Sequence, residues 1–259
     1  MVKGLETFRK AMQPYKEHFV IIGGTACDIR LTGTTMTPRA TDDIDVIVVI
    51  DRLTDDFVHA IWQFVKDGNY KAGKRVNKQG VNVYALYRFT LQDDSLDYPK
   101  KIEILSRHSD LLGEPSGFHI EPIPTDEDRH SLSAIIMDDD YYDFTIHQAE
   151  EENGLMIANN YALIVLKMHA YLNLLAERAA GRQVNTDDIK KHRSDVLKLV
   201  AAGIYPEPIK VKPKFLSILE SFTTEVQQHK QSLKDALDVT SEQIDAFLNI
   251  LRDEIFVEE

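Results

Sequence analysis

The chain has 259 residues, of which 43% are hydrophobic and 28% are charged. That length allows one large domain or two modest ones with a substantial buried core, and the composition is typical of a globular protein. The net charge of −12 argues against a protein that coats nucleic acid through a broad basic surface. No segment reaches the roughly 18 consecutive apolar residues of a membrane span, so no membrane partner is expected.

The first residues carry no apolar signal core, which makes the cytoplasm the expected location. Cys27 is the single cysteine; it has no partner for an internal disulfide, is expected to pack in the core, and belongs to no zinc-binding pattern. One local basic cluster in a predicted loop is more typical of solvated surface than of nucleic-acid contact. It consists of Lys71, Lys74, Arg75 and Lys78.

The first half of the chain alternates short β-branched runs with helical patterns. Residues 19–22 predict a buried strand that enters the Gly23-Gly24 turn, followed by a helix to about residue 31. Residues 43–50, with the sequence DIDVIVVI, predict a second buried strand. The other elements expected in this half are a helix over 5–15, a helix capped by Thr54, and strands over 81–91, 101–105, 131–137 and 144–146.

The second half is almost entirely helical in pattern. Helices are expected over 160–180, 187–202, 214–235 and 241–256, with a proline-punctuated linker over 206–213. Gly181 would end the first of these helices, Thr186 would cap the second, and a capping box at Thr240–Gln243 would begin the last. We therefore predict an α+β fold: a head over residues 1–150, with a mixed sheet flanked by helices, and a helical domain over 151–259.

Asp43 and Asp45 are the first candidates for chemistry. Side chains two residues apart on a strand point to the same face of the sheet. Two neighbouring carboxylates repel each other unless a cation lies between them, and carboxylate oxygens suit Mg²⁺, which also binds substrate phosphates. Acidic pairs also occur at exposed strand ends without a catalytic role, and a bare pair is more often structural.

The Gly23-Gly24-Thr25 turn precedes this strand. Glycine lets the backbone approach a phosphate closely, a helix N-terminus presents N–H groups to an anion, and Thr25 adds a hydroxyl. Tight strand-to-helix turns need glycine in any case, so the turn alone is weak evidence. Its position about twenty residues before the paired carboxylates favours a combined phosphate and metal site.

A third carboxylate on a neighbouring strand would complete a two-metal site. Glu103 is the preferred candidate because it is flanked by apolar residues in the run Lys101-Ile102-Glu103-Ile104-Leu105. Any half-exposed strand shows the same alternation of polar and apolar residues. The acidic run Asp138–Asp140 resembles a solvated turn and is the weaker candidate.

Lys167 is the only formally charged residue between Tyr161 and Leu175. An unpaired buried ammonium is costly, so this lysine either reaches solvent, forms a structural salt bridge, or binds an anion such as a triphosphate. On the next predicted helix, Lys191 and Asp195 lie four residues apart and share a face. The plain interpretation of that spacing is an ordinary ion pair between the two side chains.

Taken together, two stretches of the sequence resemble the signature of DNA polymerase β-type nucleotidyltransferases. They are Gly23-Gly24-Thr25-Ala26 and Arg39-Ala40-Thr41-Asp42-Asp43-Ile44-Asp45-Val46. The R-x-T-x-D-I-D form is most similar to the abortive-infection AbiE-type toxin nucleotidyltransferases. The likeness covers residues 1–110 well, and the later helices resemble the family more loosely.

The resemblance implies an enzyme that uses Mg²⁺ to move a nucleoside monophosphate from an NTP to a hydroxyl acceptor. It implies that Asp43, Asp45 and Glu103 are the catalytic carboxylates and metal ligands, and that Glu103 serves as the base. The family usually has Asp where this chain has Glu103. His192 stands where the related toxins have the first aspartate of a K-D-x-x-D pattern. The nucleotide-binding residues that the resemblance implies are Gly23, Gly24, Thr25, Arg39, Thr41, Lys167, Lys191 and Asp195.

The acceptor and the biological role stay open. The toxin relatives imply tRNA or protein as the acceptor and a small antitoxin protein as the partner of this chain. A cationic small molecule, as in aminoglycoside nucleotidyltransferases, fits the acidic composition. The alternative to an enzyme is a catalytically degenerate domain that binds a nucleotide or a partner without turnover. Glu103 and His192, which differ from the residues usual in the family, leave this alternative open.

Overall fold

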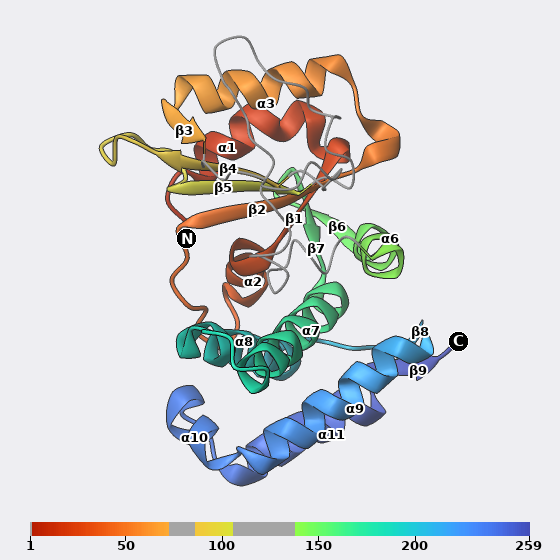
Figure 1. Cartoon of the computed structure of the whole chain (residues 1–259). Coiled ribbons are helices and arrows are strands. Elements are labelled where there is room, and N and C mark those ends of the chain that lie inside the picture. Colours follow the sequence, from red (N-terminus) through yellow and green to blue (C-terminus); the bar gives the residue numbers. More distant parts are fainter. Residues whose placement is uncertain (1, 73–85, 106–137) are drawn as a thin grey trace. The chain divides into compact units, whose positions relative to one another are not determined.

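The computed structural model describes residues 2–72, 86–105 and 138–259 (Figure 1). The chain divides into two compact units: Met1–Ile29 with Arg39–Asn159, and Arg30–Pro38 with Asn160–Glu259. The first unit is built on a mixed sheet and the second is mainly helical, so the predicted α+β class is confirmed. The first unit extends to Asn159, beyond the expected boundary at residue 150, because two further strands follow that point.

The first unit contains a seven-stranded sheet with the order β3-β4-β5-β2-β1-β7-β6. Strand β2 lies at its centre, parallel to β5 and antiparallel to β1, while β1 runs parallel to β7. The strands are β1 (Phe19–Ile22), β2 (Asp43–Val48), β3 (Tyr70–Ala72), β4 (Leu86–Leu91), β5 (Lys101–Leu105), β6 (Ala149–Glu152) and β7 (Leu155–Ala158).

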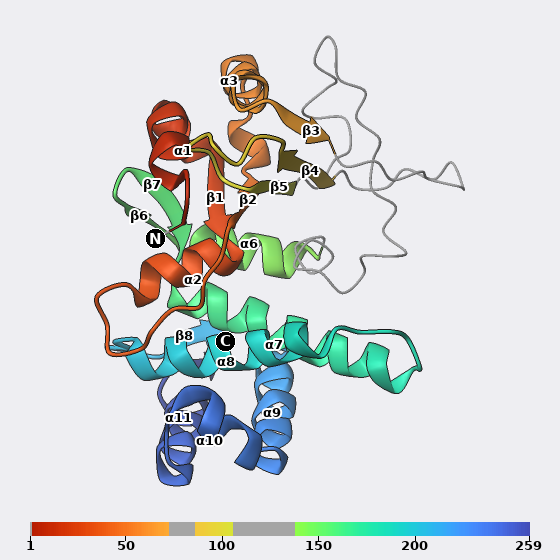
Figure 2. The ribbon, with the colours of Figure 1, turned by 90° about the vertical axis from the view of Figure 1, so that its left-hand side faces the viewer.

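Helices α1 (Leu5–Met12) and α3 (Asp55–Asp67) cover one face of this sheet (Figures 1 and 2). Aromatic contacts hold these helices on the sheet: the Phe8 ring meets Phe19 of β1 edge to face at 5.7 Å, and Trp62 meets Phe89 of β4 at 5.6 Å. Two 3₁₀ segments, Gln13–His18 and Ile50–Arg52, follow α1 and β2. Thr54 caps α3 through its side chain, which confirms that prediction.

Helices α2 (Gly23–Leu31) and α6 (Asp139–His147) lie on the opposite face (Figure 2). The hydroxyl of Tyr142 donates to the carbonyl of Val48 and accepts from the amide of Ile50, which fixes α6 to the end of β2. Cys27 on α2 is buried, as expected.

The expected strand over 144–146 is wrong, because those residues belong to α6. The side chain of Asp138 accepts from the amide of Asp140 and begins a helix that overrides the β propensity of the following aromatic and β-branched residues. The acidic run is therefore a helix start instead of a simple turn. The expected strand over 131–137 and the 81–85 part of the expected strand over 81–91 lie outside the described residues, as does most of the basic cluster near Lys71.

The second unit packs α7 against α8 and α9. Its elements are α7 (Asn160–Ala179), α8 (Thr186–Ala202), β8 (Ile209–Val211), α9 (Pro213–Gln228), α10 (Gln231–Leu237), α11 (Ser241–Asp253) and β9 (Phe256–Glu258). Strands β8 and β9 pair in parallel, so the expected linker over 206–213 contains a strand. The expected helix over 214–235 is two helices, and Asn185, not Thr186, caps α8.

The capping box at Thr240 is confirmed, because its side chain accepts from the amide of Gln243 and the Gln243 side chain accepts from the amide of Thr240. Gly181, just beyond α7, adopts a positive φ of 80°, as expected for a residue that ends a helix. Across residues 2–72, 86–105 and 138–259, no helix is long and apolar enough to cross a bilayer.

Candidate functional site

Three neighbouring strands of the sheet carry charged side chains on one face. In the strand register, Asp45 of β2 pairs with Glu103 of β5, and Glu103 pairs with Arg88 of β4. One row further along, Asp43 pairs with Lys101. Side chains of paired residues point to the same side of a sheet, so these five residues share one surface, which we name the charged face.

The remainder of β2 is apolar. Ile44 is fully buried and points to the face covered by α1 and α3, while Asp43 and Asp45 are half-buried on the other side. Ile47, two residues beyond Asp45 on the same side as the aspartates, is also fully buried. The polar part of this face is therefore confined to the beginning of β2, and the structure brings Glu103 beside it.

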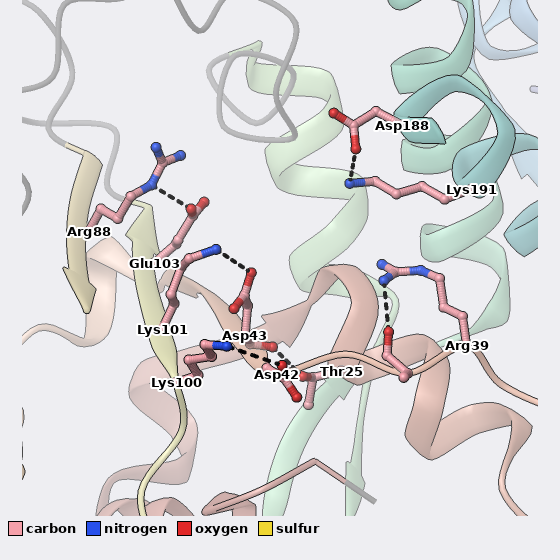
Figure 3. A network of polar contacts seen from close by, with 11 residues as sticks. Thr25, Arg39, Asp42, Asp43, Arg88, Lys100, Lys101, Glu103, Asp188 and Lys191 are labelled. Atoms are coloured by element: carbon pink, nitrogen blue, oxygen red, sulfur yellow. Dashed lines mark hydrogen bonds and ion pairs between the residues drawn. The ribbon is translucent and has the colours of Figure 1, made fainter. Parts of the chain in front are cut away.

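Two ion pairs hold two of the three carboxylates of the charged face, those of Glu103 and Asp43 (Figure 3). The Nε atom of Arg88 lies 2.6 Å from Oε1 of Glu103, and Nζ of Lys101 lies 3.2 Å from Oδ2 of Asp43. Charge compensation of this kind reduces the mutual repulsion of the three carboxylates. Arg88 and Lys101 were not predicted from sequence. Lys101 could have been found, because it precedes Glu103 by two residues and therefore shares its face.

The Gly23-Gly24 turn lies against the charged face. Gly23 has a positive φ of 71°, and a Cβ atom on it would overlap the Asp45 carboxylate. A Cβ atom on Gly24 would lie 2.6 Å from Nη2 of Arg39 and 2.8 Å from Oγ1 of Thr41. Position 23 therefore requires glycine, whereas a side chain at position 24 would have to displace the Arg39 and Thr41 side chains. The turn is in contact with Arg39, Thr41 and Asp45.

This arrangement places a guanidinium beside the N-terminus of α2. Figure 3 shows the side chain of Arg39 turned back along its own segment, with Nη1 near the carbonyl of Ala40. The N-terminal end of a helix carries a partial positive charge and unpaired N–H groups, so a neighbouring guanidinium adds charge of the same sign. Such a combination favours an anion, and phosphate oxygens match both kinds of donor.

Thr25 has a different environment from the one expected. It is fully buried, and its hydroxyl donates a 2.5 Å hydrogen bond to the backbone carbonyl of Asp43. The hydroxyl therefore joins the first turn of α2 to the start of β2 and fixes the backbone that carries the aspartates.

Thr25→Val should lower the free energy of unfolding of the first unit by about 1–3 kcal/mol, because the carbonyl of Asp43 loses the hydrogen bond from the buried Thr25 hydroxyl without a change in side-chain shape. Trp62 is the single tryptophan and lies in this unit, so urea unfolding followed by its fluorescence measures the change. Thr90→Val, a half-buried position on β4, is the matched control and should cost less than about 0.5 kcal/mol. Equal stability of the two variants would contradict the structural role of the Thr25 hydroxyl.

The other three sequence candidates belong to the helical unit. Lys167 and Asp195 form a 2.7 Å ion pair between α7 and α8, with only 1% and 2% of the two side chains exposed. Lys191 pairs with Asp188 at 2.7 Å, so the expected pair of Lys191 with Asp195 is wrong. Helix packing explains the difference, because α7 presents a buried ammonium to Asp195 while Lys191 stays at the surface, 36% exposed.

The carboxylate oxygens of the charged face are donors of the kind that Mg²⁺ prefers. Within the described part of the chain, no group of three or more histidine, cysteine, aspartate or glutamate side chains is arranged to hold a metal ion. Glu103 is held by Arg88, which leaves Asp43 and Asp45 as the pair of carboxylates beside the glycine turn. Mg²⁺ commonly uses one or two protein carboxylates and takes its other oxygens from phosphates and water. The two aspartates therefore fit an ion that arrives with a triphosphate.

Comparison of this chain with protein-family models, with curated proteins and with solved structures gives no match.

Proposed function

We propose that this chain is a nucleotidyltransferase of the DNA polymerase β type, related to the AbiE-type toxins, which moves a nucleoside monophosphate from an NTP to a hydroxyl acceptor. One observation carries the proposal: the Gly23-Gly24 turn contacts both Asp45 and the Arg39–Thr41 segment. An anion-binding helix end is thereby adjacent to two carboxylates on one strand face. A triphosphate with its metal ion needs both groups at once.

In this reaction the chain mainly provides position and charge. The amides of Gly23 and Gly24 and the guanidinium of Arg39 would bind the β- and γ-phosphates, and Asp43 and Asp45 would hold Mg²⁺. Bound there, Mg²⁺ would supply neutralisation of the charge that develops on the phosphates. The acceptor oxygen attacks the α-phosphorus in line, and pyrophosphate leaves as the phosphorus–oxygen bond to it breaks. Glu103, oriented by Arg88, accepts the proton of the attacking hydroxyl.

A second candidate has an observation of its own in its favour. Arg88 and Lys101 already neutralise the charges of Glu103 and Asp43. Ion pairs of this kind would stabilise a site that has lost its metal. A degenerate domain that binds a nucleotide or a partner protein without turnover would need no more than this. The two candidates differ in whether nucleotide binding depends on a divalent ion and on the aspartates.

The acceptor in the proposed reaction is tRNA or protein, with a cationic small molecule as the other candidate class. Incubation of the protein with each of the four NTPs, labelled at the α-phosphate, together with Mg²⁺ and one acceptor pool tests this directly. The pools are total tRNA, lysate proteins and a panel of aminoglycosides. Label transfer to one pool supports the enzyme and identifies the acceptor class. Absence of transfer to every pool favours the degenerate domain.

The same proposal assigns the protein to the cytoplasm, as a toxin controlled by a small antitoxin protein. Co-purification with the product of a neighbouring small gene, together with suppression of label transfer by that product, would support this role. Label transfer that the neighbouring product does not change would count against it.

A further inference from the structure

Lys101 lies beside a carboxylate oxygen that a metal ion at the two aspartates would use. Its Nζ atom lies 3.2 Å from Oδ2 of Asp43, and the two residues are direct partners in the parallel register of β5 and β2. Figure 3 shows the lysine side chain extended toward this carboxylate from the neighbouring strand. A divalent ion bound to the same oxygen would repel the ammonium strongly at such a distance. Metal binding at Asp43 therefore requires that Lys101 move.

Lys101 is suited to that movement and Arg88 is not. The Lys101 and Asp43 side chains are 42% and 35% exposed, whereas those of Arg88 and Glu103 are 27% and 19% exposed and their contact is shorter, at 2.6 Å. A lysine is a point charge on a flexible stem with three donors, while an arginine holds a carboxylate through a rigid planar fork. The lysine pair is therefore the exchangeable one of the two.

The displaced ammonium needs a new anion close by. A nucleotide whose metal ion lies at Asp43 and Asp45 brings phosphate oxygens to the same face, and lysine binds phosphate as a point charge. We propose that Lys101 is an exchangeable counter-cation that holds Asp43 in the metal-free protein and passes to the triphosphate when metal and nucleotide bind together. Lys101 thus couples the two ligands, and by linkage each ligand raises the affinity for the other by the same factor. The inference rests on the proposed function, since it takes an NTP with its metal as the ligand.

The coupling is measured by binding, without turnover. Mn²⁺ serves as the metal probe, with bound ion followed by electron paramagnetic resonance, and inorganic tripolyphosphate serves as a base-independent phosphate probe. In the wild type, tripolyphosphate should tighten Mn²⁺ binding on the order of tenfold, within the usual range of coupling between two ligands. Lys101→Met should bind Mn²⁺ alone about three- to fivefold more tightly, the size expected for loss of a partly exposed ion pair. The tightening caused by tripolyphosphate should shrink by at least the same factor.

Lys100→Met is the matched control. Lys100 is the adjacent residue and carries the same charge, but its Nζ atom lies 3.9 Å from Asp42, outside the charged face. This variant should behave as the wild type in both measurements. A Lys101→Met protein whose Mn²⁺ affinity and tripolyphosphate effect equal those of the wild type overturns the inference.

Asp45→Asn separates this inference from the proposed function. If it abolishes Mn²⁺ binding while Lys101→Met changes nothing, the metal site stands and the counter-cation role fails. If wild-type Mn²⁺ binding does not depend on Asp45 at all, the metal site itself fails, and the role of Lys101 fails with it.

Discussion

Asp45→Asn should lower the rate of nucleotidyl transfer roughly 10²–10³-fold, the usual loss when one preorganised electrostatic group is removed from an active site. Substitution of Asp45 is expected to lower the rate most, because its carboxylate lies against Gly23 and the residue is paired in register with Glu103. Asparagine has nearly the same shape, so packing against Gly23 is retained. Removal of one of three neighbouring carboxylates also relieves repulsion, so the fold should not be weakened.

Label transfer from an NTP, followed at saturating Mg²⁺, measures this loss. Asp42→Asn is the control, because Asp42 lies on the same segment with its side chain 61% exposed and forms a distant ion pair with Lys100, 3.9 Å away. Its activity should stay within about twofold of the wild type, and the Trp62 unfolding midpoint of both variants should match that of the wild type. Equal activity of the two variants would remove Asp45 from the proposed mechanism.

Lys167→Met should destabilise the helical unit by about 3–5 kcal/mol, because it leaves the buried carboxylate of Asp195 without its partner. Both side chains are almost completely inaccessible, at 1% and 2% exposed. Removal of both charges in Lys167→Met/Asp195→Leu should restore most of the stability, since two apolar side chains of similar volume avoid the desolvation cost of the pair. Removal of one charge of the pair is thus expected to cost more stability than replacement of both residues by apolar ones.

Urea unfolding followed by circular dichroism at 222 nm, with hydrogen exchange of the α7 and α8 amides, reports on this unit. Lys191→Met on α8 is the matched control; its exposed pair with Asp188 should contribute less than about 0.5 kcal/mol. A Lys167→Met protein as stable as Lys191→Met would show that the buried pair does not hold the two helices together. Loss of nucleotide binding without loss of stability would instead support the ligand role expected from the sequence resemblance.

Local periodicity was enough to predict the core of the candidate site. The alternation in Asp43-Ile44-Asp45 placed both carboxylates on one face before any strand pairing was known, and the burial of Ile44 between them confirms it. The same reasoning selected Glu103 for a neighbouring strand, and the register sets it directly beside Asp45. These inferences succeed because each depends on residues only two positions apart and on a single rule of strand geometry.

The ion pairs could not be derived in the same way. Arg88 meets Glu103 only because β4 and β5 pair in one register, and a shift of one residue would send Arg88 to the opposite face. The partner of Lys167 could not be derived from the sequence either. Exposure to solvent, a salt bridge and a bound phosphate are all compatible with a lysine in an apolar helix. Its partner is 28 residues further along the chain, and only the packing of α7 on α8 selects it.

The predicted helices and strands were wrong where a helix cap or pairing with a distant strand determined the secondary structure. Residues 144–146 have strand-like composition, yet the Asp138 cap begins a helix that includes them. Strand β8 has only a short β-branched alternation, Ile209-Lys210-Val211, within a proline-rich segment, and it pairs with β9 at the far end of the unit. Pairing between distant segments is a property of the folded chain that a local pattern cannot contain.

The central claim is that Asp43 and Asp45 form a metal-dependent nucleotide site, and calorimetric titration with an α,β-methylene NTP tests it most directly. Each of the four analogues is titrated with Mg²⁺ and with EDTA, into the wild type and into Asp43→Asn. We expect at least one analogue to bind the wild type in Mg²⁺, and to bind at least about tenfold more weakly after either metal removal or the substitution. Binding that is the same with and without Mg²⁺, and the same in Asp43→Asn, would contradict the claim and favour a degenerate binding domain.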